Sequence, residues 1–214
     1  MRVSRIYRGK KSNRINIDLD EEFGFSVEEA SLTKFNLYTG KDITKDEVEQ
    51  IIEQDKKEYL YNKAIEYLAR RPRSKDEMYS YLEEKASRRY KRKFENAIQK
   101  SIEALEKRGY LNDAEFAEWY GNTRLNQKKY SIYQIRSELG SKFGVDKRTC
   151  DQVLEKLDAQ KRELEGIANL VNKKYGQYKA KYKDKKTAKD KMVGYLSAKG
   201  FKWDQIKKVL STEE

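Results

Sequence analysis

The chain has 214 residues, 39% of them charged against 37% in the apolar set, and a formal net charge of +12. So little apolar material favours several small units with thin cores, and the positive charge favours a polyanionic partner. The absence of histidine and the single cysteine, Cys150, exclude His-based catalysis, most catalytic zinc sites and an internal disulfide. No apolar run approaches the roughly 20 residues of a membrane span, and the N-terminus lacks a signal sequence, so we expect a cytoplasmic protein.

Residues 1–56 are expected to form a small unit of strands and helices. Val3–Arg8 is the first strand candidate. Two further sets of apolar residues alternate with a period of two: Ile15, Ile17 and Leu19, then Phe23, Phe25 and Val27. The acidic run Asp18–Glu22 is interpreted as a hairpin turn rather than a metal site, because it lacks the spacing of a calcium loop. The pattern predicts a three-stranded meander.

The helices that follow are marked by capping boxes, in which a serine or threonine stands three positions before a glutamate or glutamine. The candidates are Ser26 with Glu29, Thr44 with Glu47, Ser74 with Glu77, and Ser131 with Gln134. From about Tyr59 onward the apolar spacing is helical, and Pro72 separates two helical patterns. Three glycines fall where helices are expected to end: Gly109, Gly144 and Gly200.

One pair of apolar residues, four positions apart, occurs three times at intervals of 57 residues. The pairs are Met78 with Leu82, Ile135 with Leu139, and Met192 with Leu196. Ser74 and Ser131 keep the same register, as do Lys85, Lys142 and Lys199. Two equal spacings predict a repeat protein. We expect a mostly α-helical fold in which three tandem three-helix repeats form an elongated curved array after the N-terminal β-meander and helix unit. The expected boundaries are 1–56, 57–110, 111–158 and 159–214.

Three segments carry a family resemblance. They are Ala64–Ser74, Gly109–Ala117 and Ile135–Leu139, with Arg124 between the last two. This set resembles the motifs shared by the RecX family of recombination regulators, and Lys191–Phe201 matches them more loosely. Asn112 and Phe143 depart from the family pattern.

The resemblance implies a non-enzymatic regulator acting in DNA recombination, DNA repair and the SOS response. Proteins of this family bind the RecA recombinase filament in its helical groove and block its growth or promote its disassembly. They thereby inhibit strand exchange and the co-protease activity, and many also bind DNA. On this basis we expect the RecA filament and single- or double-stranded DNA as partners, no cofactor, no membrane contact and a monomer when free.

Basic side chains are the candidate contacts, because lysine and arginine neutralise phosphates and release counterions. Arginine also offers a planar fork to a phosphate or to a partner carboxylate. In the third repeat the lysines alternate with Tyr175, Tyr178 and Tyr182, on which bases can stack, although their i, i+3, i+7 spacing favours packing. The residues singled out are Arg70, Arg71, Arg73, Arg88, Arg89, Lys91, Arg92, Lys93, Arg124, Lys128, Lys129, Arg136, Lys173, Lys174, Lys185 and Lys186.

Two functions from different classes stay open. One is a regulator that inhibits or modulates the recombinase, ATPase and co-protease activities of the RecA filament. The other is a sequence-tolerant DNA-binding architectural protein that acts without the recombinase, whose binding to bare DNA would collapse with salt. An enzyme is disfavoured, because the sequence contains neither a phosphate-binding Gly-x4-Gly-Lys loop nor a recognisable set of catalytic residues.

Overall fold

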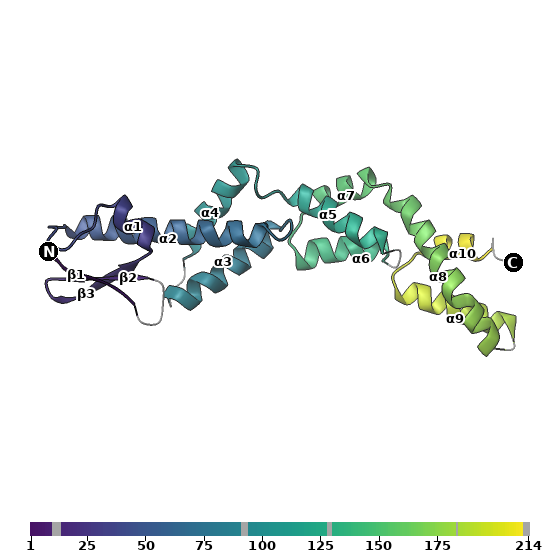
Figure 1. Cartoon of the computed structure of the whole chain (residues 1–214). Coiled ribbons are helices and arrows are strands. Elements are labelled where there is room, and N and C mark those ends of the chain that lie inside the picture. The colour runs from purple at the N-terminus through teal and green to yellow at the C-terminus, as the bar shows by residue number, and fades with distance from the viewer. Residues whose placement is uncertain (10–13, 91–93, 128–129, 183, 212–214) are drawn as a thin grey trace. The chain divides into compact units, whose positions relative to one another are not determined.

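The computed structural model describes residues 1–9, 14–90, 94–127, 130–182 and 184–211. Within these ranges the chain forms a three-stranded sheet, ten α-helices and one π-helical turn (Figure 1), which confirms the mostly α-helical fold behind a small N-terminal sheet. In chain order the elements are β1 (Val3–Arg8), β2 (Ile15–Leu19), β3 (Glu22–Val27), α1 (Glu29–Lys34), α2 (Lys45–Leu68), α3 (Lys75–Tyr90), α4 (Glu95–Lys107), α5 (Asp113–Asn126), α6 (Ile132–Ser137), η1 (Glu138–Lys142), α7 (Lys147–Lys156), α8 (Ala159–Lys181), α9 (Lys185–Ala198) and α10 (Trp203–Leu210).

The three strands form an antiparallel sheet in the order β1-β2-β3, as the alternation of apolar residues predicts. Asp20 and Glu21, between β2 and β3, have φ angles of 49° and 72°. Two central residues with positive φ make the kind of two-residue turn whose twist matches that of the paired strands. The acidic run is therefore a hairpin turn, and the Asp20 carboxylate accepts a hydrogen bond from the Arg2 amide at 2.8 Å.

One face of the sheet packs against α1 and α2 (Figure 1). Val3, Ile17 and Phe25 of the sheet share a buried cluster with Ile51 of α2, and Leu32 of α1 packs against it. The short sheet is therefore stabilised by the two helices that follow it, as a sheet of this size requires.

A buried carboxylate on α2 adds a polar centre to the N-terminal unit. Asp55 is 1% exposed. It accepts hydrogen bonds from the Glu28 amide at 2.7 Å, the Ser31 hydroxyl at 3.0 Å and the Arg14 guanidinium at 2.8 Å. One side chain thus joins the start of β2 and the start of α1 to α2.

The capping box expected at Ser26 and Glu29 is wrong. Strand β3 continues through Val27, so Ser26 lies in the strand, where its hydroxyl accepts a hydrogen bond from Arg14 at 3.0 Å. Helix α1 does begin at Glu29, but its N-cap is Glu28 and no side chain caps it. The local spacing fails here because a contact with a distant part of the chain occupies the serine.

The capping box at Thr44 and Glu47 is formed in both directions and opens α2. This helix of 24 residues continues without a break to Leu68. The helix predicted from Thr44 and the helical pattern predicted from Tyr59 are therefore one helix.

The apolar pair that defines the repeat is buried at all three occurrences, on α3, on α6 with η1, and on α9. Each of the six side chains is 0% exposed: Met78, Leu82, Ile135, Leu139, Met192 and Leu196. The Ser74 and Ser131 hydroxyls accept hydrogen bonds from the amides three residues later, each at 3.1 Å, and so cap α3 and α6. Helix α9 begins earlier than α3 and α6 do in the register of the repeat. Asp184 caps it, so Ala188, at the position of the two serines, lies inside the helix.

The second repeat contains one extra residue between its apolar pair and the glycine that follows. Leu139 and Gly144 are five positions apart, whereas Leu196 and Gly200 are four positions apart. The π-helical turn η1 accommodates the extra residue, because its i→i+5 hydrogen bonds close over one residue more than those of an α-helix. The apolar pair and the glycine therefore both keep their structural roles.

Phe143, where the sequence departs from the family pattern, follows η1 directly and is 5% exposed. Its ring meets those of Phe116 and Tyr120 edge to face, with centroids 5.0 and 4.9 Å away. The departure from the pattern therefore adds an aromatic ring to the core of the second repeat.

The described chain divides into two compact units: residues 1–69 with 81–104, and residues 70–80 with 105–214. The second unit contains two apolar cores, one formed by α5–α7 and one by α8–α10. Across the described ranges, no helix is long and apolar enough to cross a membrane.

Candidate nucleic-acid and partner interface

The arginines of the first turn, between α2 and α3, are largely engaged within the protein. Both terminal guanidinium nitrogens of Arg71, Nη1 and Nη2, donate to the Glu77 carboxylate, at 3.0 and 2.5 Å, and the group lies 5.2 Å from the Trp119 ring centroid. Arg73 is only 9% exposed and lies 3.4 Å from the same carboxylate. Arg70 is exposed. This turn therefore leaves Arg70 exposed, while Arg71 and Arg73 stabilise the start of α3.

The cluster at the end of α3 is divided in the same way. The Arg88 side chain is 73% exposed and forms an ion pair with Glu84 at 2.7 Å. Arg89 is mostly buried, lies 3.7 Å from the Tyr59 ring centroid and pairs with Glu28. The other predicted contacts of this cluster, Lys91, Arg92 and Lys93, lie outside the described residues.

Arg124 of the second repeat belongs to a polar network on α5. Its Nε donates to the Tyr120 hydroxyl at 2.8 Å and lies 3.2 Å from Glu138, and its guanidinium lies over the Tyr130 ring at 4.4 Å. Burial, followed by the hydrogen bond to Glu138, raises the pKa of Tyr120 to about 12. Arg124 is therefore held in place by three neighbours. Lys128 and Lys129 fall outside the part of the chain that the structure describes.

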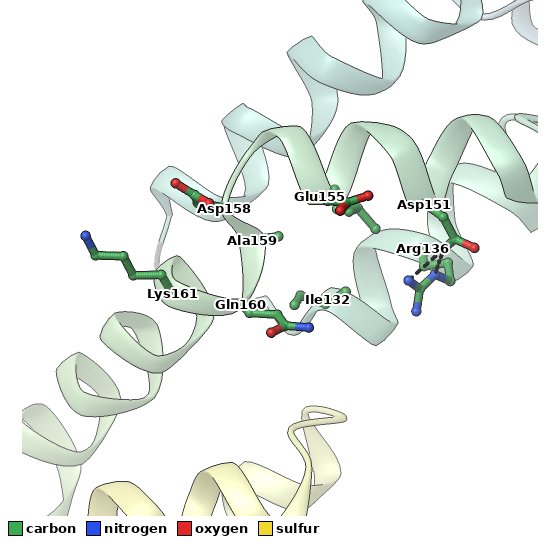
Figure 2. A pocket seen from close by; sticks show the side chains of 9 residues that line it. Ile132, Arg136, Asp151, Glu155, Asp158, Ala159, Gln160 and Lys161 are labelled. Carbon is green, nitrogen blue, oxygen red and sulfur yellow. Dashed lines mark hydrogen bonds and ion pairs between the residues drawn. The ribbon is translucent and has the colours of Figure 1, made fainter.

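Arg136 lines a surface pocket of about 540 Å³ between α6, α7 and the start of α8 (Figure 2). It forms an ion pair with Asp151 at 2.7 Å, and Lys161 lies at the opposite end of the pocket. The wall also carries Glu155 and Asp158. A wall with both signs of charge suits a polar protein surface better than an isolated anion. Within the described ranges, no group of three or more acidic or cysteine side chains is placed to hold a metal ion.

Three of the four lysines predicted as contacts in the third repeat are accessible. Lys173, Lys185 and Lys186 are exposed, and Lys174 is half-buried over the Tyr195 ring at 4.2 Å. Residues 159–214 contain 15 lysines and arginines against seven aspartates and glutamates, a net charge of +8. This repeat therefore offers the strongest attraction for a polyanion.

The tyrosines that alternate with these lysines pack inward. Tyr175 is 8% exposed, and Tyr178 and Tyr182 pack against the same core cluster. Their helical spacing therefore reflects packing, which confirms the favoured interpretation. Bases cannot stack freely on these rings.

Successive repeats contact each other through the same arrangement at both junctions, a carboxylate bonded to a backbone amide, which local sequence spacing does not reveal. At the first junction, the amide of Lys75 on α3 donates to the Asp113 carboxylate on α5 at 2.9 Å. At the second junction, the amide of Ile132 on α6 donates to the Glu163 carboxylate on α8 at 2.6 Å. Each carboxylate caps the second helix of the preceding repeat, where unpaired amides and the helix dipole favour a negative charge.

A glycine of the next repeat lies against the same helix terminus at both junctions. Gly144 and Gly200 have φ angles of 67° and 78°, which favour glycine. A Cβ on Gly144 would lie 1.8 Å from a carboxylate oxygen of Asp76, and one on Gly200 would lie 2.9 Å from the Ser131 hydroxyl. The sequence marked these glycines as helix ends, but their contact with the preceding repeat is a long-range feature.

Burial raises the pKa of both junction carboxyls above their ordinary values. The amide hydrogen bonds act in the opposite direction and do not cancel this effect. Glu163 is 4% exposed and accepts a second hydrogen bond, from the Gln205 side chain on α10 at 2.7 Å. The second junction thus joins α6, α8 and α10 through one carboxylate.

Comparison with known protein families matches both ends of the chain. Residues 1–44 match the pattern described as the regulatory protein RecX N-terminal domain. Residues 161–210 match the pattern described as RecX, third three-helix domain.

Individual relatives match nearly the whole chain. The regulatory protein RecX of Clostridioides difficile is 30% identical over 210 residues, which are 98% of this chain and 94% of the relative. The regulatory protein RecX of Listeria monocytogenes is 32% identical over 208 residues, 95% of this chain and 72% of the relative.

Two solved structures share the fold. A crystal structure of regulatory protein RecX matches over 98% of both chains, with a TM-score of 0.69 and 21% identity. The crystal structure of RecX from Lactobacillus salivarius covers 74% of this chain and 97% of its own, with a TM-score of 0.64 and 26% identity.

Proposed function

Because this chain belongs to the RecX family of regulatory proteins, we propose that it binds the filament of the RecA recombinase and inhibits or modulates its activities. The observation that carries the proposal is the match to regulatory relatives over almost the whole chain. We further propose that the protein acts in the cytoplasm, as a monomer when free, and by binding rather than by catalysis.

The arrangement of the repeats supports a mechanism based on several moderate contacts. The two junctions hold the second helices of successive repeats through carboxylates, of which Asp113 is half-buried and Glu163 is buried. Contacts made by linked repeats add up when the partner is itself repetitive, so a filament is favoured over a single recombinase subunit. The exposed lysines of the third repeat would meet phosphates of the DNA within the filament, and the pocket beside Arg136 would meet protein.

The test is a titration of the protein into RecA that hydrolyses ATP on single-stranded DNA at near-physiological salt. We expect inhibition well below one copy per recombinase subunit, because a ligand bound along a polymer affects several subunits. Inhibition that needs one copy for every subunit, or no inhibition, would contradict the proposal.

The chain offers a matched pair of variants for this titration. Lys185 and Lys186 are the first two residues of α9, behind the capping residue Asp184, and Lys147 and Arg148 occupy the same positions of α7 behind Asp146. All four cations are exposed, but only the first pair lies in the strongly basic repeat. We expect Lys185→Gln with Lys186→Gln to raise the concentration needed for inhibition several-fold. Lys147→Gln with Arg148→Gln should leave that concentration unchanged.

The charge of +8 in residues 159–214 also supports a second candidate function, a DNA-binding architectural protein that needs no recombinase. The two functions differ in their response to salt, because phosphate contacts alone weaken steeply as counterions become abundant. Binding to bare DNA that disappears at near-physiological salt, while binding to the filament persists, favours the regulator. Persistent binding to bare DNA without any effect on the recombinase favours the architectural protein.

A further inference from the structure

The two junctions share one framework, a carboxylate that caps a helix and a glycine packed against the same terminus, but they differ in the side chains that they expose. The second residue of α3 is Asp76 and the first residue of α7 is Lys147. At the second junction these positions are occupied by Tyr133 on α6 and Trp203 on α10. Tyr133 is 67% exposed and Trp203 is 62% exposed. Because the first junction forms with polar residues at both positions, the framework does not require aromatic rings there.

Contacts within the second junction hold the two aromatic segments together. A Cβ on Gly200, three residues before Trp203, would lie 3.2 Å from Cδ1 of Tyr133. On the other side, Gln205 donates a hydrogen bond to Glu163, and Glu163 also accepts one from the amide of Ile132. Trp203 therefore lies between two residues that contact the start of α6, and Tyr133 lies at that start.

Cations flank Trp203 on both sides, and one acidic residue, Asp204, directly follows it. Lys202 directly precedes Trp203 and is exposed. It also lies close to Glu163, because its charge partly offsets the rise that burial causes in the pKa of that carboxyl. Lys207 lies one turn after Trp203 on α10 and is exposed, whereas Arg136, one turn after Tyr133, is engaged by Asp151. Exposed aromatic rings beside cations fit a nucleic-acid strand, because the rings stack on bases while the cations meet phosphates.

We propose that Tyr133 and Trp203 form a stacking site for unpaired bases of single-stranded nucleic acid. A duplex covers its base faces by internal stacking, so the rings select strands whose bases are unpaired. The inference rests on the proposed function in one respect: a protein bound to the recombinase filament lies within reach of nucleic acid. Its test contains no recombinase, so the site and the regulation can fail independently.

The chain provides its own reporter for the test. It has two tryptophans, and Trp119 is half-buried beside Phe116, with ring centroids 6.0 Å apart. In a Trp119→Phe variant, Trp203 is the only tryptophan. We expect oligothymidylate of about 20 nucleotides to quench its emission in a saturable manner at low salt, because a stacked base quenches an indole ring.

Affinity is then measured by the fluorescence anisotropy of a labelled oligothymidylate. We expect Trp203→Leu and Tyr133→Leu each to weaken binding about five- to hundredfold, the range for loss of one stacked base. Tyr110→Leu is the matched control, because Tyr110 is 56% exposed but lies in the loop between α4 and α5. Its affinity should equal that of the unmodified protein. Urea unfolding midpoints check that all three variants fold.

Two results would overturn the proposal. Oligothymidylate that binds without quenching Trp203, and equally well to Trp203→Leu, would mean that lysine–phosphate contacts suffice. Absence of binding even at low salt would exclude a nucleic-acid site at this junction.

Discussion

At Asp55, a carboxylate that is 1% exposed accepts three hydrogen bonds, one of them from the Arg14 guanidinium. The Arg14 side chain is itself only 14% exposed. Removing one partner of such a pair leaves the other charge buried without compensation, which costs more than the pair contributes when both are present. The same reasoning applies to the junction carboxylates, which bond backbone amides that would otherwise have no partner.

We therefore expect Asp55→Ala to lower the free energy of unfolding by about 3–5 kcal/mol, the usual cost of breaking a buried ion pair. Asp55→Asn keeps an acceptor oxygen and should cost less. Urea unfolding followed by circular dichroism measures both. Equal losses for the two variants would mean that the charge of Asp55 carries the whole effect and that the hydrogen bonds to Glu28 and Ser31 contribute nothing.

Glu163 predicts a pH dependence. Its folded-state pKa is raised above the ordinary 4.5, mainly by burial. A carboxyl with a raised pKa stabilises the fold fully below its unfolded-state pKa, and this contribution is lost as the pH rises through the folded-state pKa. Glu163→Gln removes the titration. As the pH rises from the unfolded-state pKa through the folded-state pKa, the unmodified protein should therefore lose stability relative to the variant.

Urea unfolding of both proteins at several pH values measures this difference. Glu155→Gln, on an exposed residue of α7, serves as the control and should show no comparable trend. A constant difference between Glu163→Gln and the unmodified protein would contradict the inferred burial of the charge.

At the scale of elements, two glycines that both end helices have different surroundings. Gly109 and Gly200 have similar φ angles, 72° and 78°. A Cβ on Gly109 would have nothing within 4 Å, whereas one on Gly200 would lie 2.9 Å from Ser131 and 3.2 Å from Tyr133. The first glycine only ends a helix, and the second also allows the preceding repeat to approach.

This difference predicts that Gly200→Ala destabilises the protein more than Gly109→Ala. Both variants carry the cost of a left-handed conformation, about 1–2 kcal/mol. Gly200→Ala should cost about 1–3 kcal/mol more, because the added carbon displaces the Ser131 hydroxyl that caps α6. Urea unfolding gives both values, and equal losses would mean that the junction relaxes without penalty.

Features set by neighbouring residues could be predicted from the sequence. The three strands, the capping box at Thr44 and the buried pair repeated at 57-residue intervals follow from local spacing and burial. Even the π-helical turn has a signal, since the glycine after Leu139 comes one position late. The capping box at Ser26 was mispredicted because Arg14, 12 residues away, occupies that hydroxyl.

The junctions could not be predicted in the same way. Lys75 and Asp113 are 38 residues apart, and Ile132 and Glu163 are 31 residues apart. Nothing in the spacing of a lone acidic residue tells which distant amide it will cap. The candidate interface shares this difficulty, since Arg71 and Lys186 look alike as basic residues, yet Arg71 is engaged by Glu77 and Lys186 is exposed.

At the scale of the whole molecule, the net charge of +12 is unevenly distributed along the chain. Residues 57–110 carry +6 and residues 159–214 carry +8, whereas residues 1–56 carry −2 and residues 111–158 are neutral. Counterion release depends on cations that reach phosphates, not on total charge. We therefore expect most of the salt dependence of the proposed nucleic-acid binding to come from the third repeat, whose lysines are exposed.

The slope of log affinity against log salt tests this assignment. Each phosphate contact with a single strand contributes about −0.7 to the slope. Lys185→Gln with Lys186→Gln should make the slope less steep by about 1.4, because two such contacts are lost. Lys147→Gln with Arg148→Gln removes the same charge from the neutral repeat and should leave the slope unchanged. Anisotropy of a labelled single strand between about 50 and about 300 mM salt measures all three slopes. Equal changes in the two variants would mean that binding responds to total charge, and that the third repeat holds no localised phosphate contact.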